Sequence, residues 1–263
     1  MDSQGIIMTN LKNKLILITG ASSGIGEASA IEFAKLGANL LLLARREDRL
    51  NSIAKNLENT FKVKTKSVKV DIRNYDSIKN LQTNLTEEWS EPDIILNNAG
   101  LARGFSKIYE ADTKDWEEMI DTNIKGLLYI TRTFLPGMIE RRKGHIINIG
   151  STAGHETYTY GNVYSATKFA VKALTQSIRL DVLDKGIKVT SIDPGMVITE
   201  FSKVRFSGDE ERAKKVYEGI EPLTAKDVAE AVIFAATRSA NVNTNEIILT
   251  PLQQASSTQV YRK

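Results

Sequence analysis

The feature that most constrains the fold of this chain is a regular alternation of short apolar runs with longer segments of helical length. The apolar runs are continuous, as expected for strands buried on both faces of a parallel sheet. We therefore predict a doubly wound α/β sheet of about seven strands. The predicted strands are residues 14–19, 40–44, 68–70, 93–97, 145–150, 187–192 and 246–249, and the predicted helices lie near 25–36, 47–58, 75–89, 113–141 and 162–184.

No linker interrupts this alternation, so the sequence predicts a single domain over residues 1–263. The least regular stretch, about 196–220, is polar and carries Gly208 and Gly219, and we interpret it as a lid beside the functional site. The polar tail, 251–263, is predicted either to be loose or to cover a neighbouring subunit's site.

Composition excludes several classes of function. The chain has no cysteine, which excludes disulfides and thiolate chemistry, and the sequence shows no cluster of metal ligands, so no metal is expected. The net charge of +3 is too small to indicate a nucleic-acid partner. Lys62, Lys64, Lys66 and Lys69 fit the solvated edge of a strand better than a polyanion site.

Nothing in the sequence predicts export or a membrane partner. The segment 1–7 lacks the basic start of a secretory signal. The longest dense apolar run, 40–44, is far shorter than the roughly 20 residues that a spanning helix needs. We expect a soluble, cytoplasmic protein.

A glycine-rich loop follows the first predicted strand and precedes the first predicted helix. Glycines allow a tight turn and a close approach of the backbone to a pyrophosphate, which the N-terminus of the helix also attracts. The spacing is Gly-x3-Gly-x-Gly, and it differs from the commoner dinucleotide fingerprint. A serine-glycine turn that only caps the helix is the alternative. The predicted phosphate-binding residues are Gly20, Ser22, Ser23, Gly24, Ile25 and Gly26.

The end of the second strand indicates which dinucleotide binds. NAD-binding folds usually place a carboxylate there for the ribose 2′-hydroxyl, whereas this chain has Arg45 and Arg46. Guanidinium groups pair with phosphate through a planar fork, so we predict NADP(H) as the cofactor. The alternative is that both arginines only neutralise Glu47 and Asp48.

Two further strand ends are predicted to line the cofactor. Asp71 follows the third strand and is placed to accept from the adenine amino group, although a helix N-cap explains it equally well. The fourth strand ends in a run of small residues, of which Asn97, Ala99 and Gly100 are predicted to pack beside the adenine ribose.

Four polar residues form a candidate catalytic set. Tyr164 and Lys168 lie four residues apart, which puts them on one face of a helix. A lysine ammonium beside a phenol favours the phenolate, so the pair suits proton transfer. Ser151 follows the fifth strand and is placed to hydrogen-bond a reacting oxygen. Asn123 is a poor residue for a helix interior, which suggests a local role such as holding a water.

Together these motifs resemble the short-chain dehydrogenase/reductase family, over about residues 11–249. The resemblance rests on the glycine loop, the Asn-Asn-Ala-Gly run at 97–100, the four polar residues and Pro194-Gly195. It implies a Rossmann-type fold in which Tyr164 exchanges the proton and Lys168 lowers the pKa of Tyr164 and holds the nicotinamide ribose. It also implies that Ser151 polarises the substrate oxygen and that Asn123 anchors a water. By the same resemblance, Pro194 and Gly195 shape the nicotinamide pocket, the Val197 backbone bonds the carboxamide, and Thr199 reaches the pyrophosphate.

The segments 135–138, 144–154, 161–171 and 200–206 are similar to those of the family's NADP-dependent 3-hydroxy acid dehydrogenases. That similarity implies a homotetramer acting on serine, allo-threonine or 3-hydroxypropanoate. Arg205 is the candidate partner of a substrate carboxylate, with a solvated arginine of the lid as the alternative. His155, beside Glu156, is a candidate pocket residue, with an ordinary loop residue as the alternative. One alternative is a reductase of a larger ketone, diketone or sugar, whose substrate could stack on the aromatic side chains of the loop 152–161. The other is a dinucleotide-binding regulator without turnover.

Overall fold

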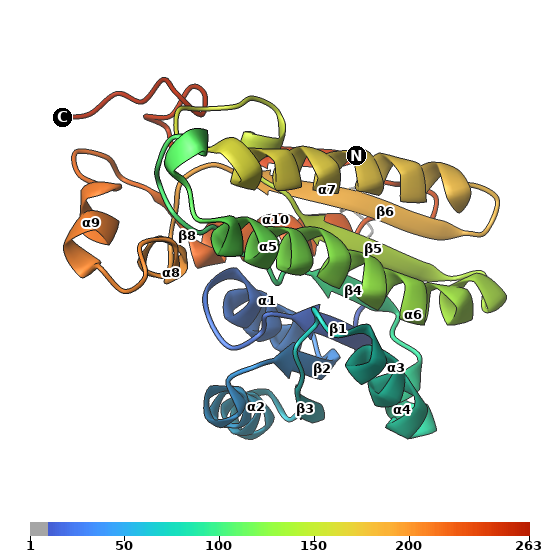
Figure 1. The fold of residues 1–263 in the computed structure, drawn as a ribbon. Helices are drawn as coiled ribbons and strands as arrows, with labels where there is room; N and C mark the ends of the chain where they lie inside the picture. Colours follow the sequence, from blue (N-terminus) through green and yellow to red (C-terminus); the bar gives the residue numbers. More distant parts are fainter. Residues whose placement is uncertain (1–9) are drawn as a thin grey trace, which may run out of the picture.

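The computed structural model describes residues 10–263, so the segment 1–7, for which the sequence predicts no export signal, lies outside the described residues. A seven-stranded parallel sheet, in the order β3-β2-β1-β4-β5-β6-β9, forms the centre of the molecule (Figure 1). This confirms the predicted doubly wound sheet. Its strands are β1 (Leu15–Thr19), β2 (Asn39–Ala44), β3 (Thr65–Lys69), β4 (Ile94–Asn97), β5 (Gly144–Ile149), β6 (Ile187–Pro194) and β9 (Glu246–Leu249).

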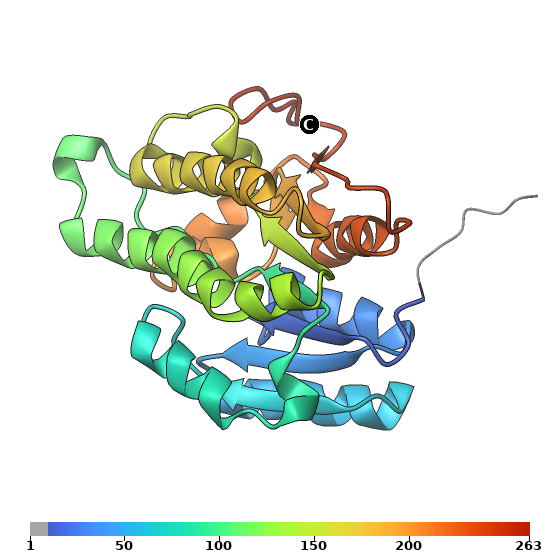
Figure 2. The same cartoon turned by 90° about the vertical axis from the view of Figure 1, so that its right-hand side faces the viewer.

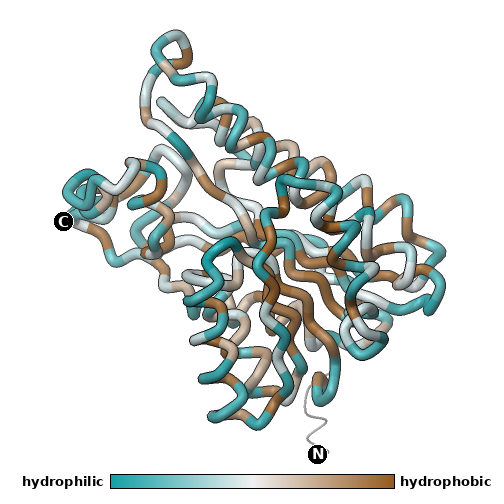
Figure 3. Tube along the Cα trace, turned by 60° about the horizontal axis from the view of Figure 1, so that its bottom comes forward, coloured by the Kyte–Doolittle hydropathy of each residue, from teal (hydrophilic) through white to brown (hydrophobic). Residues whose placement is uncertain are grey.

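Helices cover both faces of this sheet (Figures 1 and 2). One core packs β1 and β2 against α1 (Gly24–Lys35), α2 (Glu47–Phe61) and α10 (Ala225–Ala236). The other core packs the opposite face against α3 (Tyr75–Asn84), α6 (Leu127–Glu140) and α7 (Asn162–Asp181). Hydrophobic residues are concentrated in the central strands, and polar residues are concentrated in the outer helices (Figure 3). The continuous apolar runs of the sequence are thus the strands that both layers bury.

The helix predicted over 113–141 is built from three consecutive segments. α5 (Thr113–Ile120) is followed by a π-helical turn, Asp121–Gly126, and then by α6. A π-turn inserts an extra residue into the helix and is frequent at functional sites. Asn123, the residue that disfavours a helix interior, lies in this turn.

The third strand begins earlier than the sequence predicts and lies at one edge of the sheet. Lys66 and Lys69 lie in this edge strand, whereas Lys62 is the C-cap of α2 and Lys64 precedes the strand. Lys64 pairs with Glu88 of α4 (Glu87–Ser90), and Lys69 pairs with Glu47 at 3.4 Å. Only part of the lysine run therefore forms the charged strand edge that the sequence predicts.

The irregular stretch after β6 folds into short elements beside the carboxyl ends of the strands. They are β7 (Val197–Ile198), α8 (Phe201–Arg205), α9 (Glu210–Lys215) and β8 (Leu223–Thr224). The tail after β9 packs on its own chain: Gln254 Oε1 accepts from Met196 N at 2.8 Å, and Ser257 N donates to Glu156. Figures 1 and 2 show the tail beside the loop that follows β5. No helix within residues 10–263 is long and apolar enough to cross a membrane.

His145 on β5 makes the fold sensitive to acid. Its Nε2 lies 2.8 Å from Thr190 Oγ1, and its Nδ1 is buried without a partner among residues 10–263. Burial, with a smaller contribution from Lys188, lowers the pKa of His145 to about 3. The unfolded chain takes up this proton near pH 6.5, whereas the folded chain does so only near pH 3. Stability is therefore full above the unfolded pKa and falls as the pH drops toward the folded one.

We expect wild type to lose about 1.4 kcal/mol more unfolding free energy per pH unit between pH 6 and 4 than His145→Gln, which cannot titrate. Urea unfolding of both proteins across this range measures the two slopes. Parallel slopes would show that His145 is protonated without cost in the folded protein.

Candidate active site

A cleft of about 450 Å³ lies at the carboxyl ends of the strands. The neighbouring strands β1 and β4 mark the point where the strand order reverses: β2 and β3 follow on the β1 side, and β5 and β6 follow on the β4 side. This switch point is where doubly wound sheets bind ligands. The cleft brings together most of the residues that the sequence predicts for a site. Those lining it are Gly20, Ser22, Ser23, Gly24, Ile25, Arg45, Arg46, Asp71, Ala99, Gly100, Ser151, Tyr164, Lys168, Pro194, Gly195, Val197 and Thr199.

The glycine loop between β1 and α1 forms one wall. Gly20 has a φ of +65°, and an ideal Cβ there would lie 2.9 Å from Ala99 Cα. Ser23, the N-cap residue of α1, makes no side-chain cap hydrogen bond, which leaves the first N–H groups of that helix available. A loop of this geometry at a helix N-terminus fits a pyrophosphate. Gly26 does not line the cleft; an ideal Cβ there would lie 2.5 Å from Asn98 Nδ2, so it permits close packing of α1.

Asn98 holds this loop, although the sequence motif pointed to its neighbour Asn97. Asn98 Nδ2 donates to Thr19 O at 2.9 Å, and its side chain lines the cleft. Asn97 points the other way: its Nδ2 donates to Asn148 Oδ1 at 2.9 Å inside the core. Successive residues of a strand face opposite sides of the sheet, which explains why only one of the pair reaches the cleft. The structure therefore does not bring Asn97 into the predicted adenine-ribose wall.

Arg45 and Arg46 stand at one end of the cleft with exposed guanidinium groups. Arg46 donates to Ser23 Oγ at 2.6 Å and to Glu200 Oε2 at 2.7 Å, which ties the end of β2 to the glycine loop and to the segment between β7 and α8. Glu47 pairs with Lys69, so neutralising Glu47 does not account for the arginines. Hydrogen bonds from Arg49 and Arg46 lower the pKa of Glu200 to about 2.

Asp71 lines the cleft but carries a partner that sequence reasoning missed. Arg73 NH2 and Nε donate to its carboxylate at 2.5 and 2.9 Å. Burial acts to raise the pKa of Asp71, but the hydrogen bonds from Arg73 hold it below its usual value. The alternative reading as an N-cap is wrong, because Asn74 caps α3 by accepting from Ser77 N.

Ser151, Tyr164 and Lys168 meet at the other end of the cleft. Ser151 lies two residues after β5 and caps the short turn Thr152–Gly154, while α7 carries Tyr164 and Lys168 on its buried side. Ser151 lies close enough to Tyr164 to lower its pKa, and Lys168 Nζ lies 5.9 Å from the centre of the Tyr164 ring. Phe201 of the lid packs edge-on against this ring at 5.5 Å. The set therefore surrounds one point where a substrate oxygen could sit.

The electrostatics of the pair are set mainly by burial. Burial, and next Tyr158, raise the pKa of Tyr164 above its usual value, and Ser151 and Arg205 oppose this. Burial lowers the pKa of Lys168 to about 8, although Asp193 acts to raise it. That Lys168 lowers the pKa of Tyr164 stays a prediction.

Lys168 also has hydrogen-bonding capacity left over. An ammonium has three N–H donors. Ile149 O, at 2.9 Å, is the acceptor found for it within residues 10–263. A buried cation with unused donors in a cleft fits a ligand that carries hydroxyl groups, such as a ribose.

Asn123 lies behind the cleft rather than in its wall. Its Oδ1 accepts from Leu101 N at 2.9 Å, and its Nδ2 donates to Leu101 O and to Thr167 Oγ1. An ideal Cβ on Gly100 would lie 3.4 Å from Asn123 Oδ1 and 3.7 Å from Lys168 Nζ. The π-turn thus brings the Asn123 amide near Lys168 and fixes it to the strand end.

Arg205 and His155, the two candidate substrate residues, both lie outside the residues that line the cleft, and they face different neighbours. Arg205 is held against aromatic rings: NH1 donates to Tyr158 OH at 2.8 Å, and its guanidinium lies 5.7 Å from the Tyr164 ring centre. His155 is outside the cleft lining, and its Nε2 instead lies 2.7 Å from Asp193 Oδ2. The predicted place of His155 in the pocket is therefore wrong, because the turn after Ser151 directs its ring behind β6.

Comparisons with known proteins agree with this geometry. The family model described as short chain dehydrogenase matches residues 14–210. The NADP-dependent 3-hydroxy acid dehydrogenase of Schizosaccharomyces pombe is 42% identical, covering 97% of this chain and 99% of that protein. The serine 3-dehydrogenase of Rhizobium radiobacter is 40% identical, covering 94% and 98%.

Among solved structures, the closed form of serine dehydrogenase complexed with NADP+ superposes with a TM-score of 0.88. It is 43% identical, and the match covers 95% of this chain and all of that one. The family match spans the glycine loop, the end of β4 and the Ser151, Tyr164 and Lys168 set. This chain belongs to the short-chain dehydrogenase family, as its motifs led us to expect.

Proposed function

We propose that this chain is an NADP(H)-dependent oxidoreductase that interconverts a small 3-hydroxy acid or serine-like compound and its carbonyl. The observation that carries the proposal is a single cleft with two arginines at one end and Ser151, Tyr164 and Lys168 at the other. Relatives named for NADP-dependent 3-hydroxy acid and serine dehydrogenation, similar over nearly their whole length, support the substrate class.

The cleft fits a dinucleotide that carries an additional phosphate. The glycine loop and the free end of α1 would hold the pyrophosphate, and Thr199 faces them: an ideal Cβ on Gly24 would lie 3.4 Å from its Cβ. Arg45 and Arg46 would hold the 2′-phosphate, with the serine hydroxyls already orienting Arg46. Pro194, Gly195 and Val197 would wall the nicotinamide. Once bound, NADP supplies or accepts the hydride.

The protein's own residues manage the proton. Tyr164 would donate its hydroxyl proton to the carbonyl oxygen in reduction and take it back in oxidation. Ser151 would orient that oxygen beside Tyr164. Lys168, buried and with donors to spare, would hold the ribose and place a positive charge near the phenol. Asn123 would keep the turn, and a water bound there, in register with Lys168.

Arg205 is the proposed partner of the substrate carboxylate. Its contacts to Gly104 O, Tyr158 OH and Tyr160 O use three of its five N–H groups, which leaves two for an anion. Its side chain is fixed by cation–π contacts, at 4.8 Å from Phe105 and 5.6 Å from Tyr158. A pre-oriented cation beside the Tyr164 ring would select small hydroxy acids over neutral alcohols.

We extend the proposal to a homotetramer. α7 exposes Phe169 and Leu180, which are 41% and 73% exposed, and the edge strand β9 exposes Ile248, 52% exposed. Large apolar side chains on a helix and on a sheet edge are suited to contacts between copies. Sedimentation equilibrium should give about four times the mass of one chain.

An assay with both cofactors tests the proposed function. We expect NADP, and not NAD at equal concentration, to be reduced with L-serine, L-allo-threonine or 3-hydroxypropanoate, followed at the absorbance of NADPH. Silence on all three, with NADPH consumed by bulky ketones, diketones or sugars, would replace the substrate class. Silence on every substrate despite NADPH binding would favour a regulator without turnover.

A further inference from the structure

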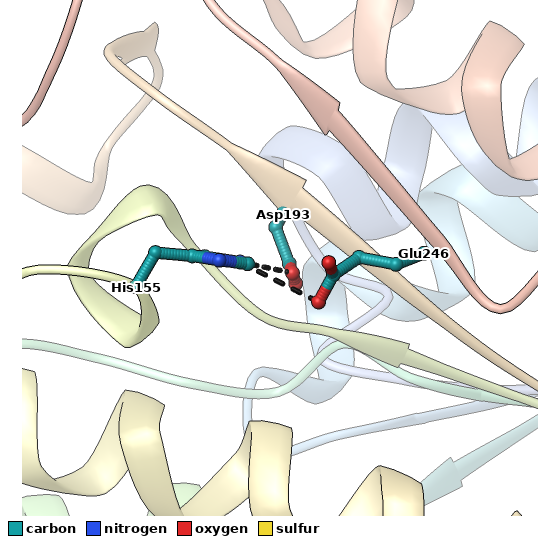
Figure 4. Close-up of side chains that lie close together, drawn as sticks. All are labelled: His155, Asp193 and Glu246. Atoms are coloured by element: carbon teal, nitrogen blue, oxygen red, sulfur yellow. Dashed lines mark hydrogen bonds and ion pairs between the residues drawn. The ribbon is translucent and has the colours of Figure 1, made fainter.

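Behind the cleft lies a group of ionisable side chains that the proposed chemistry does not use. We call it the His155 cluster: it comprises His155 after β5, Lys172 on α7, Asp193 on β6 and Glu246 on β9. Figure 4 shows His155 pointing at the two carboxylates. Asp193 is the most buried member, with 1% of its surface exposed.

Hydrogen bonding fixes the charges in this cluster. Lys172 Nζ lies 2.8 Å from His155 Nδ1, and an ammonium only donates, so Nδ1 accepts. The proton of the neutral ring is then on Nε2, which donates to Asp193 Oδ2 at 2.7 Å. Ser191 Oγ donates to Asp193 Oδ1. Both oxygens of Asp193 accept, as in an ionised carboxylate.

The cluster is not well suited to a metal ion. Ligand atoms of His155, Asp193 and Glu246 lie within 4.8 Å of one another, a spacing that an ion could bridge. However, Lys172 already supplies a positive charge, 3.7 Å from Glu246 Oε1. Its donation to Nδ1 also places the ring proton on the nitrogen that a metal would need.

Asp193 and Lys168 contact the same peptide unit of the chain, at the end of β5. An ideal Cβ on Gly150 would lie 1.9 Å from Asp193 Oδ1, so the carboxylate lies directly against that residue. Lys168 Nζ donates to Ile149 O, one residue earlier, at 2.9 Å. The turn Thr152–Gly154 packs on α7, the helix that carries Lys168: an ideal Cβ on Gly154 would lie 2.7 Å from Lys168 O. The carboxylate thus lies just behind the lysine and the Ser151 turn.

We propose that Asp193 is a positioning residue for Lys168: its buried negative charge, held by His155 and Ser191, keeps the lysine in its ammonium form. The relevance of this charge to turnover rests on the proposed function. An ammonium removed from water loses solvation, and a nearby opposite charge, here across the peptide unit that both side chains contact, compensates.

Asp193 is the charged group that acts to raise the pKa of Lys168. The pKa of Lys168 is lowered by burial and raised by Asp193. The other charged groups of the cluster, Lys172 and Glu246, pair with each other at 3.7 Å. On its own helix, Lys168 faces the Tyr164 ring.

Asp193→Asn tests the proposal, because an amide keeps the shape and an acceptor for His155 while removing the charge. Titration of ¹³Cε-labelled lysines by NMR, with the Lys168 signal assigned by its loss in Lys168→Met, follows the group directly. We expect a midpoint of about 8 in wild type. In Asp193→Asn we expect it roughly one pH unit lower. The alkaline limb of kcat/KM for carbonyl reduction should move the same way.

Ser191→Ala is the matched control, since it removes a hydrogen bond from the same carboxylate but leaves its charge. It should move the Lys168 midpoint less than Asp193→Asn does. An unchanged Lys168 titration in Asp193→Asn would overturn the inference whatever the activity. A shifted titration in a protein without NADP-dependent turnover would support the charge coupling and overturn only the proposed function.

Discussion

Tyr164→Phe is expected to lower kcat by roughly 10²- to 10⁴-fold, the usual contribution of a positioned general acid–base. The substitution removes one hydroxyl group and keeps the ring, whose centre lies 5.5 Å from the centre of the Phe201 ring. Because the glycine loop and the arginines are untouched, the Kd of NADPH should change little. Stopped-flow turnover and NADPH fluorescence titration measure the two quantities separately.

Tyr129→Phe provides the matched control for this variant. Tyr129 lies on α6 and does not line the cleft, and the centre of its ring is 5.0 Å from that of Tyr75. Loss of its hydroxyl should leave kcat at the wild-type value. Near-normal turnover in Tyr164→Phe would remove Tyr164 from the proton transfer, and a large loss of NADPH affinity would show that its hydroxyl serves binding instead.

The fold was predictable because burial acts on whole segments. Each central strand is an apolar run that two helix layers cover, so hydropathy alone located the sheet. β3 was the exception: its residues 65–67 carry a lysine and two hydroxyl side chains, and the strand exists through pairing with β2 at the edge of the sheet. Such pairing leaves no apolar signal in the sequence.

The site was predictable where a motif sets backbone position, and less so where side-chain direction decides. Asn97 and Asn98 share a motif, but only strand alternation separates the residue in the core from the residue that holds the glycine loop. Applied to β4, that alternation would have given the right choice.

Partners that are distant in the sequence could not be predicted. Glu200 meets Arg46 across 154 positions of the chain, and Asp193 meets His155 across 38. Neither pair has a spacing signal, because the lid and β6 reach their partners only once the sheet has formed. The π-turn at Asp121–Gly126 was likewise indicated only by an asparagine in an otherwise regular helix.

Replacing both arginines, by Arg45→Ala with Arg46→Ala, should raise the KM for NADPH by about 10²-fold or more and leave the KM for NADH nearly unchanged. Each hydrogen bond to a charged group contributes about 1.5–3 kcal/mol, so the loss of two raises the KM by the product of the two separate factors. The remaining carboxylate of Glu200, which Arg46 neutralises at 2.7 Å, would also repel a 2′-phosphate. Initial rates with each cofactor measure the change in preference.

Arg49→Ala separates phosphate binding from general loss of positive charge. Arg49 pairs with the same carboxylate, Glu200, at 2.7 Å, but it does not line the cleft. Its removal deletes a neighbouring guanidinium and should alter the KM for NADPH only a few-fold, through the charge left on Glu200. If Arg49→Ala matched the double variant, the effect would be one of net charge. If the double variant kept its preference for NADPH, the 2′-phosphate would have to be held elsewhere in the cleft, and Arg73 beside Asp71 would be the next group to replace.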